Sequence, residues 1–113
     1  MTLPKPLVWL HGEVKSPPFS LEARRETGFL LRRLQDGEVL SMPASRPLPA
    51  IAQNCHELRI ADRNATWRIV YYLDSDAVVI LEVFSKKTRA LPTIVASAAR
   101  RRLNQYLKLT KEE

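Results

Sequence analysis

Alternating hydrophobic and polar residues in the middle of the chain predict three consecutive β-strands. They are HELRI (56–60), WRIVYYL (67–73) and VVILEVF (78–84). The third strand is apolar on both faces apart from Glu82, so we expect it inside the sheet. Because short turns rich in Asp, Asn and Ser connect the strands, the pattern predicts an antiparallel meander.

Helical periodicity flanks the predicted sheet on both sides. A helix over residues 21–36 is predicted by its apolar spacing, with Ser20 as N-cap and Gly37 as C-cap. A second helix begins near Pro92, a residue that is favoured in the first helical turn. The short apolar run 7–10 follows two prolines and predicts an edge strand.

The predicted order of elements indicates the α+β class, built on a small antiparallel β-meander. We expect the C-terminal helix to pack on the sheet face that carries Trp67 and Ile69, so that the helices cover one face. The other face then displays Arg59 and Arg68. With 113 residues, the chain is expected to be one domain, 1–113.

Composition narrows the classes of protein that the chain can belong to. The hydrophobic fraction of 45% and the charged fraction of 27% are ordinary for a folded domain. The single cysteine, Cys55, excludes an internal disulfide framework and fits a reducing cytoplasm. No apolar run is long enough for a bilayer, and the N-terminus lacks a secretory signal, so we expect a cytoplasmic protein without membrane contact.

The charge of the chain points to a polyanionic partner. Its formal net charge is +6, and the segment from Val83 to Lys111 contains no acidic residue. Such a balance favours contact with nucleic acid or with an acidic protein, whereas the alternative is a solvated basic surface without a partner.

Standard catalytic motifs are absent from the sequence. It contains no glycine-rich phosphate loop, no nucleophile elbow and no cluster with metal-ligand spacing, so we expect neither a metal nor a cofactor. Cys55 and His56 are neighbours and therefore point to opposite faces of a strand, which favours a structural role for Cys55.

The polar face of the meander is the remaining candidate for chemistry. We expect Arg59, Arg68 and Glu82 to be cross-strand neighbours, a cationic surface suited to a phosphate. RNA supplies its own nucleophile, the 2′-hydroxyl, so positioning plus one base and one proton donor would be enough for cleavage. The candidate bases are Glu57, Glu82 and His56, and the candidate assisting groups are Tyr72, Lys86 and Lys87. Alternatively, Glu82 joins the arginines in an ion-pair network that only ties the strands together.

Several segments resemble one known group of proteins. HELRI, TWRIVYYL and VILEVFSKKT, followed by a short C-terminal helix, resemble the RelE/ParE/HigB toxin superfamily, with the strongest likeness to its phage-derived HigB-like subgroup. The segments PLVWLHGEVKSPPF, GFLLRRLQDGE and RPLP resemble the same subgroup, so the likeness covers nearly the whole chain. It implies a RelE-like α+β fold with helices on one face and a basic face on the other.

The resemblance also implies a function. It implies the toxin of a type II toxin–antitoxin pair, neutralised by a helix-turn-helix antitoxin, through which alone the toxin would meet operator DNA. The best-known activity of such toxins is metal-free cleavage of mRNA on the ribosome through the 2′-hydroxyl. Their basic strand positions fall on Arg59 and Arg68, and their basic loop falls on Lys86 and Lys87. We therefore expect these four residues in catalysis, and the same four with Tyr72 and Arg89 in RNA binding.

Two departures from the pattern keep other functions open. Glu57 stands where lysine-rich members have a lysine, and the segment from Thr88 to Thr93 lacks the tyrosine or histidine that several active members place there. The alternatives are a ParE-like toxin that binds gyrase, and a non-catalytic regulatory partner of a DNA-binding antitoxin.

Overall fold

A computed structural model of the chain describes residues 3–85 and 90–111. In chain order its elements are β1 (Leu7–Trp9), α1 (Leu21–Gln35), β2 (Ser45–Pro47), β3 (Cys55–Ala61), β4 (Thr66–Leu73), β5 (Val78–Ser85) and α2 (Thr93–Lys111). The α+β class and every element expected from the sequence are confirmed. The short strand β2 is additional, and it lies at a sheet edge, where proline is tolerated.

The strands form one mixed sheet in the order β1-β5-β4-β3-β2. Strands β3, β4 and β5 pair antiparallel in sequence order, which confirms the predicted meander. Strand β1 pairs parallel to β5 and occupies one edge, as predicted, while β5 lies inside the sheet. The pairing of β4 with β5 shifts by one residue between Val70 and Tyr71, and this irregularity matters for Glu82 below.

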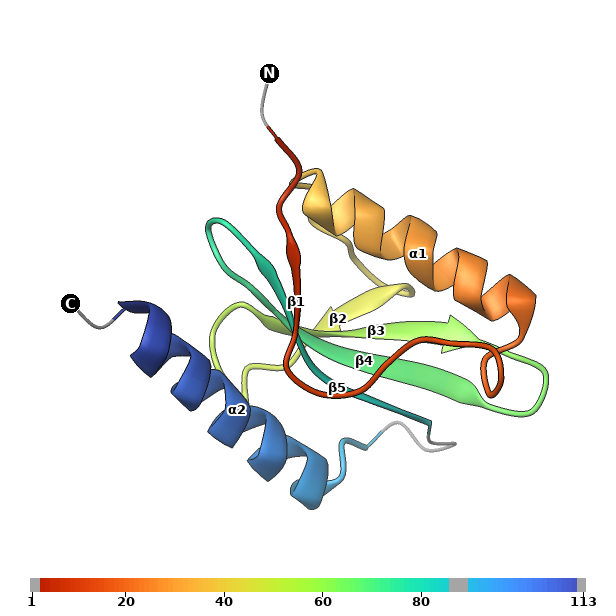
Figure 1. Cartoon of the computed structure of the whole chain (residues 1–113). Coiled ribbons are helices and arrows are strands. Elements are labelled where there is room, and N and C mark those ends of the chain that lie inside the picture. Colours follow the sequence, from red (N-terminus) through yellow and green to blue (C-terminus); the bar gives the residue numbers. More distant parts are fainter. Residues whose placement is uncertain (1–2, 86–89, 112–113) are drawn as a thin grey trace.

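The two helices cover opposite faces of the sheet, so the expectation that both pack on one face is wrong (Figure 1). Helix α1 buries Leu30 and Leu34 in a core that includes Ile69 of β4. Helix α2 buries Leu103 in a separate core that includes Val70. The reason is that β4 and β5 carry apolar side chains on both faces over part of their length, which creates a second apolar surface for α2.

The N-terminus of α1 is fixed to the turn between β3 and β4. Ser20 is the N-cap, and its hydroxyl accepts a hydrogen bond from the Ala23 amide at 3.0 Å. The Asp62 carboxylate accepts hydrogen bonds from the Ser20 amide at 2.9 Å and from the Trp67 indole at 2.8 Å. The Ser20 amide and hydroxyl, followed by the Trp67 indole, lower the pKa of Asp62. Phe19 stacks on Trp67 with ring centroids 4.2 Å apart, so helix and turn form one rigid corner.

The last turn of α2 is anchored at the turn between β4 and β5. The Asp74 carboxylate accepts a hydrogen bond from the Tyr106 hydroxyl at 3.3 Å and pairs with the Lys111 ammonium at 3.2 Å. Among residues 3–85 and 90–111, no helix is long and apolar enough to cross a membrane.

Candidate nucleic-acid interface

Four charged residues on three neighbouring strands form what we call the arginine cluster: Arg46, Glu57, Arg59 and Arg68. Arg46 of β2 pairs in register with Glu57 of β3, and Arg59 of β3 pairs with Arg68 of β4. On β3, Leu58 and Ile60 face the α1 core, so Glu57 and Arg59 point to the face that α2 packs on. The cluster therefore shares a face with α2 but lies toward the β2 edge of the sheet.

Glu57 holds two of the arginines. Its side chain is fully buried, with one carboxylate oxygen 3.0 Å from the Arg46 Nε and the other 3.6 Å from an Arg68 terminal nitrogen. A buried carboxylate between two guanidinium groups compensates their charge and restricts their orientation. Glu57 is thus inaccessible to solvent in this structure.

Arg68 is far more buried than the sequence suggests. Only 1% of its surface is exposed, whereas we expected it on an open basic face. Burial lowers the pKa of the Arg68 guanidinium, the Glu57 carboxylate opposes this effect, and the nearby positive charges of Arg59 and Arg46 add to it. The side chain remains charged because an arginine pKa starts so high, so the cluster concentrates positive charge where water has little access.

Arg59 is the more accessible partner of Arg68. A cavity of about 70 Å³ lies among Met42, Arg46, Arg59 and Arg68. The buried Nε of Arg59 has no hydrogen-bond partner among the residues that the structure describes. A cavity of this size holds a few water molecules or one small anionic group. With three guanidinium groups and one carboxylate, the cluster is formally cationic and suited to a phosphate oxygen.

Glu82 lies elsewhere on the sheet than expected. It pairs in register with Val70, and Phe84 stands opposite Arg68, so the prediction that Glu82 neighbours Arg59 and Arg68 is wrong. The shift between Val70 and Tyr71 puts Glu82 on the α2 face, but its partner there is Val70, two residues along β4 from Arg68. There the carboxylate lies 3.2 Å from Arg102 of α2, with the other oxygen 3.5 Å from the His11 ring. Glu82 thus forms an ion pair that joins a helix to the sheet, which differs from the alternative of a network with Arg59 and Arg68 between strands.

His56 lies away from the arginine cluster. Its ring stacks on that of Tyr71, with centroids 5.5 Å apart, on the α1 side of the sheet. This agrees with the alternation that groups His56 with Leu58.

Tyr72 is on the α2 side but packs against the apolar core at the other end of β4. Burial, and next the Asp74 carboxylate, raise its pKa. Tyr72 is thus not one of the residues that the structure gathers around Arg68. The remaining predicted site residues, Lys86, Lys87 and Arg89, lie outside the described residues.

Arg46 is the site residue that the sequence reasoning missed. It lies in residues 38–54, whose three prolines disfavour a central strand, and only the pairing of the edge strand β2 with β3 brings it to Glu57. Its flanking Ser45 faces the α1 side and shares a 2.6 Å hydrogen bond with the Tyr71 hydroxyl. The one available signal was the position of Arg46 between small or rigid residues in the segment that precedes the strand predicted at 56–60.

Neither a reactive thiol nor a metal cluster is found in the described part of the chain. Cys55 is buried beneath α2, and burial raises the pKa of its thiol to about 11, so the sulfur stays protonated at neutral pH. No group of three or more His, Cys, Asp or Glu side chains within residues 3–85 and 90–111 is arranged to hold a metal ion.

A comparison with known protein families identifies the chain. The model of the phage-derived Gp49-like protein family (DUF891) matches residues 18–104, which run from just before α1 into the second half of α2. The arginine cluster lies inside the matched segment. A comparison with curated proteins finds no match. The chain belongs to the phage-derived Gp49-like family, a RelE-like toxin family associated with toxin–antitoxin pairs.

Proposed function

We propose that this protein is the toxin of a type II toxin–antitoxin pair and that it cleaves mRNA on the ribosome without a metal. The proposal places it in the cytoplasm, in complex with a helix-turn-helix antitoxin when it is silent, and on operator DNA only through that antitoxin. It also assigns the protein to the HigB-like subgroup of the superfamily. The observation that carries the proposal is the arginine cluster, inside a chain that belongs to a toxin family.

The chemistry follows from charge. In RNA cleavage the 2′-hydroxyl loses its proton as its oxygen attacks the adjacent phosphorus. A 2′,3′-cyclic phosphate forms, and the bond from phosphorus to the 5′-oxygen of the next nucleotide breaks as that oxygen takes up a proton. The phosphoryl oxygens gain negative charge in the transition state, where fixed cationic donors stabilise them more than in the ground state. Arg59 has an unused buried donor beside the cavity, and Glu57 fixes Arg46 and Arg68 around it.

Further phosphate contacts in this proposal come from Lys86, Lys87 and Arg89, which follow β5 in sequence.

A proton-transfer group is the part of the site that the described residues supply least well. Glu57 is buried between Arg46 and Arg68. Glu82 pairs with Arg102, and His56 stacks on Tyr71. The proposal therefore relies chiefly on charge stabilisation and on positioning of the 2′-hydroxyl by the ribosome-bound RNA.

Growth arrest after induction tests the proposal. Wild-type protein is expected to stop growth, and Arg59→Gln is expected to relieve the arrest because it removes a charge from the cluster. Arg59 is preferred to the buried Arg68 because its replacement threatens the fold less. The matched control is Arg24→Gln, an exposed arginine of α1 outside the cluster, which should leave the arrest unchanged. Wild-type protein that accumulates folded without slowing growth would contradict the proposal.

A ParE-like toxin that binds gyrase is the second candidate. It is favoured by one observation: within residues 3–85 and 90–111, each of the three predicted bases already contacts another side chain. Glu57 pairs with Arg46 and Arg68, Glu82 pairs with Arg102, and His56 stacks on Tyr71. This candidate predicts induction of the DNA-damage response with stable mRNA during the arrest. A regulatory partner without toxicity would leave growth normal in the same experiment.

A further inference from the structure

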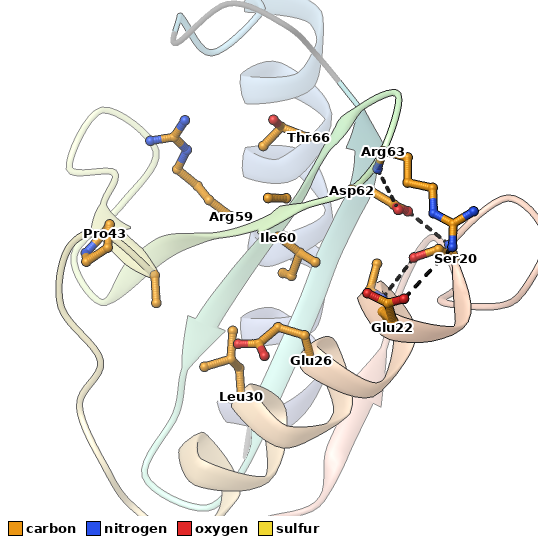
Figure 2. Close-up of a pocket in the computed structure, with 13 residues that line it drawn as sticks. Ser20, Glu22, Glu26, Leu30, Pro43, Arg59, Ile60, Asp62, Arg63 and Thr66 are labelled. Atoms are coloured by element: carbon orange, nitrogen blue, oxygen red, sulfur yellow. Dashed lines mark hydrogen bonds and ion pairs between the residues drawn. The ribbon is translucent and has the colours of Figure 1, made fainter.

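A second groove, which shares Arg59 with the arginine cavity, runs between α1 and the outer edge of β3 (Figure 2). Its volume is about 840 Å³, within the range of typical ligand-binding clefts. Apolar side chains of Ala23 and Leu30 from α1, with Ile60 from β3, form part of its lining. The rigid corner at Ser20 and Asp62 closes one end, so the groove is preformed.

The β3 edge beside this groove is unpaired. Strand β2 pairs with β3 only as far as Leu58, and the Arg59 amide donates a final hydrogen bond to the Ala44 carbonyl at 2.9 Å. Because outward-pointing backbone groups recur at every second residue, the amide and carbonyl of Ala61 also point outward. No outer hydrogen bond to them is formed by the described residues.

The wall opposite this edge is acidic. Glu22 and Glu26 lie on the groove side of α1, and Figure 2 shows Glu26 pointing from the helix toward β3. Within residues 3–85 and 90–111, Glu26 forms no ion pair, and Glu22 forms only an exposed one with Arg63 at 3.9 Å. Exposed pairs of this kind contribute little and yield to a competing cation. Two arginines, Arg59 and Arg63, also line the groove, but they come from the β3 side and not from the α1 wall.

We propose that the groove is the docking site for an extended basic segment of a partner protein. The segment adds a short strand to the edge of β3 through the free backbone groups of Ala61 and the Arg59 carbonyl. Every second residue of the segment faces the helix. Among these residues, lysine or arginine lies beside Glu22 and Glu26, and a small apolar residue lies over Leu30. Backbone pairing supplies affinity, and the alternate side chains supply specificity. The inference concerns binding alone and does not require RNA cleavage.

A synthetic peptide tests the site directly. The probe is about seven residues long, which spans about 20 Å when extended. Lysine, valine and lysine alternate on one face, with threonine at the intervening positions. Its counterpart carries glutamate in place of both lysines. Binding to the full chain is followed by fluorescence anisotropy, and amide hydrogen exchange identifies the backbone groups that become protected.

The lysine probe is expected to bind and to slow exchange at the Ala61 amide, while the glutamate probe binds at least about tenfold more weakly. Glu26→Gln should weaken the lysine probe by about two- to fivefold. The matched control Glu38→Gln removes an exposed carboxylate that pairs with Arg33 outside the groove, and it should leave the affinity unchanged. Equal binding of both probes, no binding of the lysine probe, or unchanged exchange at Ala61 would overturn the proposal.

Discussion

Removing the charge of Glu57 is the sharpest test of how the arginine cluster is held together. Glu57→Gln keeps the shape of the side chain but takes away the negative charge that lies 3.0 Å from Arg46 and 3.6 Å from Arg68. Both Glu57 and Arg68 are essentially inaccessible to water, with exposed fractions of 0% and 1%. Arg68 then keeps its positive charge in a buried position without the carboxylate beside it.

The expected cost is large for a domain of this size. Removing one partner of a buried ion pair destabilises a protein by about 3–5 kcal/mol. The free energy of unfolding of a small domain is about 5–15 kcal/mol in total, so the variant loses a large fraction of its stability. The melting temperature is expected to fall by roughly 10–20 °C. By contrast, the exposed pair of Arg33 with Glu38, at 3.1 Å, contributes less than about 1 kcal/mol.

Urea and thermal unfolding, followed by circular dichroism, measure both quantities. Glu38→Gln is the control and should unfold close to wild type. The double variant Glu57→Gln with Arg68→Met should be more stable than the sum of its single changes predicts, because it removes the buried cation as well. A Glu57→Gln protein whose free energy of unfolding lies within about 0.5 kcal/mol of wild type would refute the account of the cluster.

Four further predictions concern the scaffold. Gly12→Ala should destabilise the protein by about 1–3 kcal/mol in urea unfolding, because Gly12 has φ +87° and an added Cβ would lie 2.8 Å from Val83 side-chain atoms. Gly28→Ala should instead stabilise it by about 0.5–1 kcal/mol, since the helical Gly28 has open space around it; the reverse order would contradict this reasoning. The lowered pKa of Asp62 means that its ionised form stabilises the fold above the ordinary pKa of 3.8, and that this contribution is lost as the pH falls below it. Asp62→Asn should therefore flatten the acid limb of the stability profile, and an unchanged limb would argue against the corner. Cys55, with its pKa raised to about 11, should react with iodoacetamide far more slowly in native than in unfolded protein at neutral pH, and equal rates would contradict its burial.

The fold was largely predictable because its signals are local. Alternation over β3, β4 and β5, together with the Ser20 cap, determines where the elements begin and end. Which face α2 covers was not predictable in the same way. Strand β4 carries Ile69 on one face and Val70 on the other, both fully buried, so local pattern offers either face to a helix. The choice depends on how the chain enters and leaves the sheet.

The site was predictable only in part, for a related reason. Arg59 and Arg68 were correctly placed opposite each other, since that follows from turn length and strand register. Glu82 was misplaced because the sequence does not reveal that β4 and β5 pair in a register that sets Phe84 opposite Arg68. Arg46 was missed because it reaches the cluster through an edge strand of three residues, which is too short to show an alternating pattern in the sequence.

The central claim is that the arginine cluster cleaves translated mRNA, and mapping of mRNA 5′ ends after induction tests it most directly. Cells that express the wild-type protein are expected to accumulate new 5′ ends inside translated reading frames as growth stops. Cells that express Arg59→Gln at the same level should lack those ends, while Arg24→Gln should retain them. Intact mRNA throughout a growth arrest caused by the wild-type protein would contradict the claim.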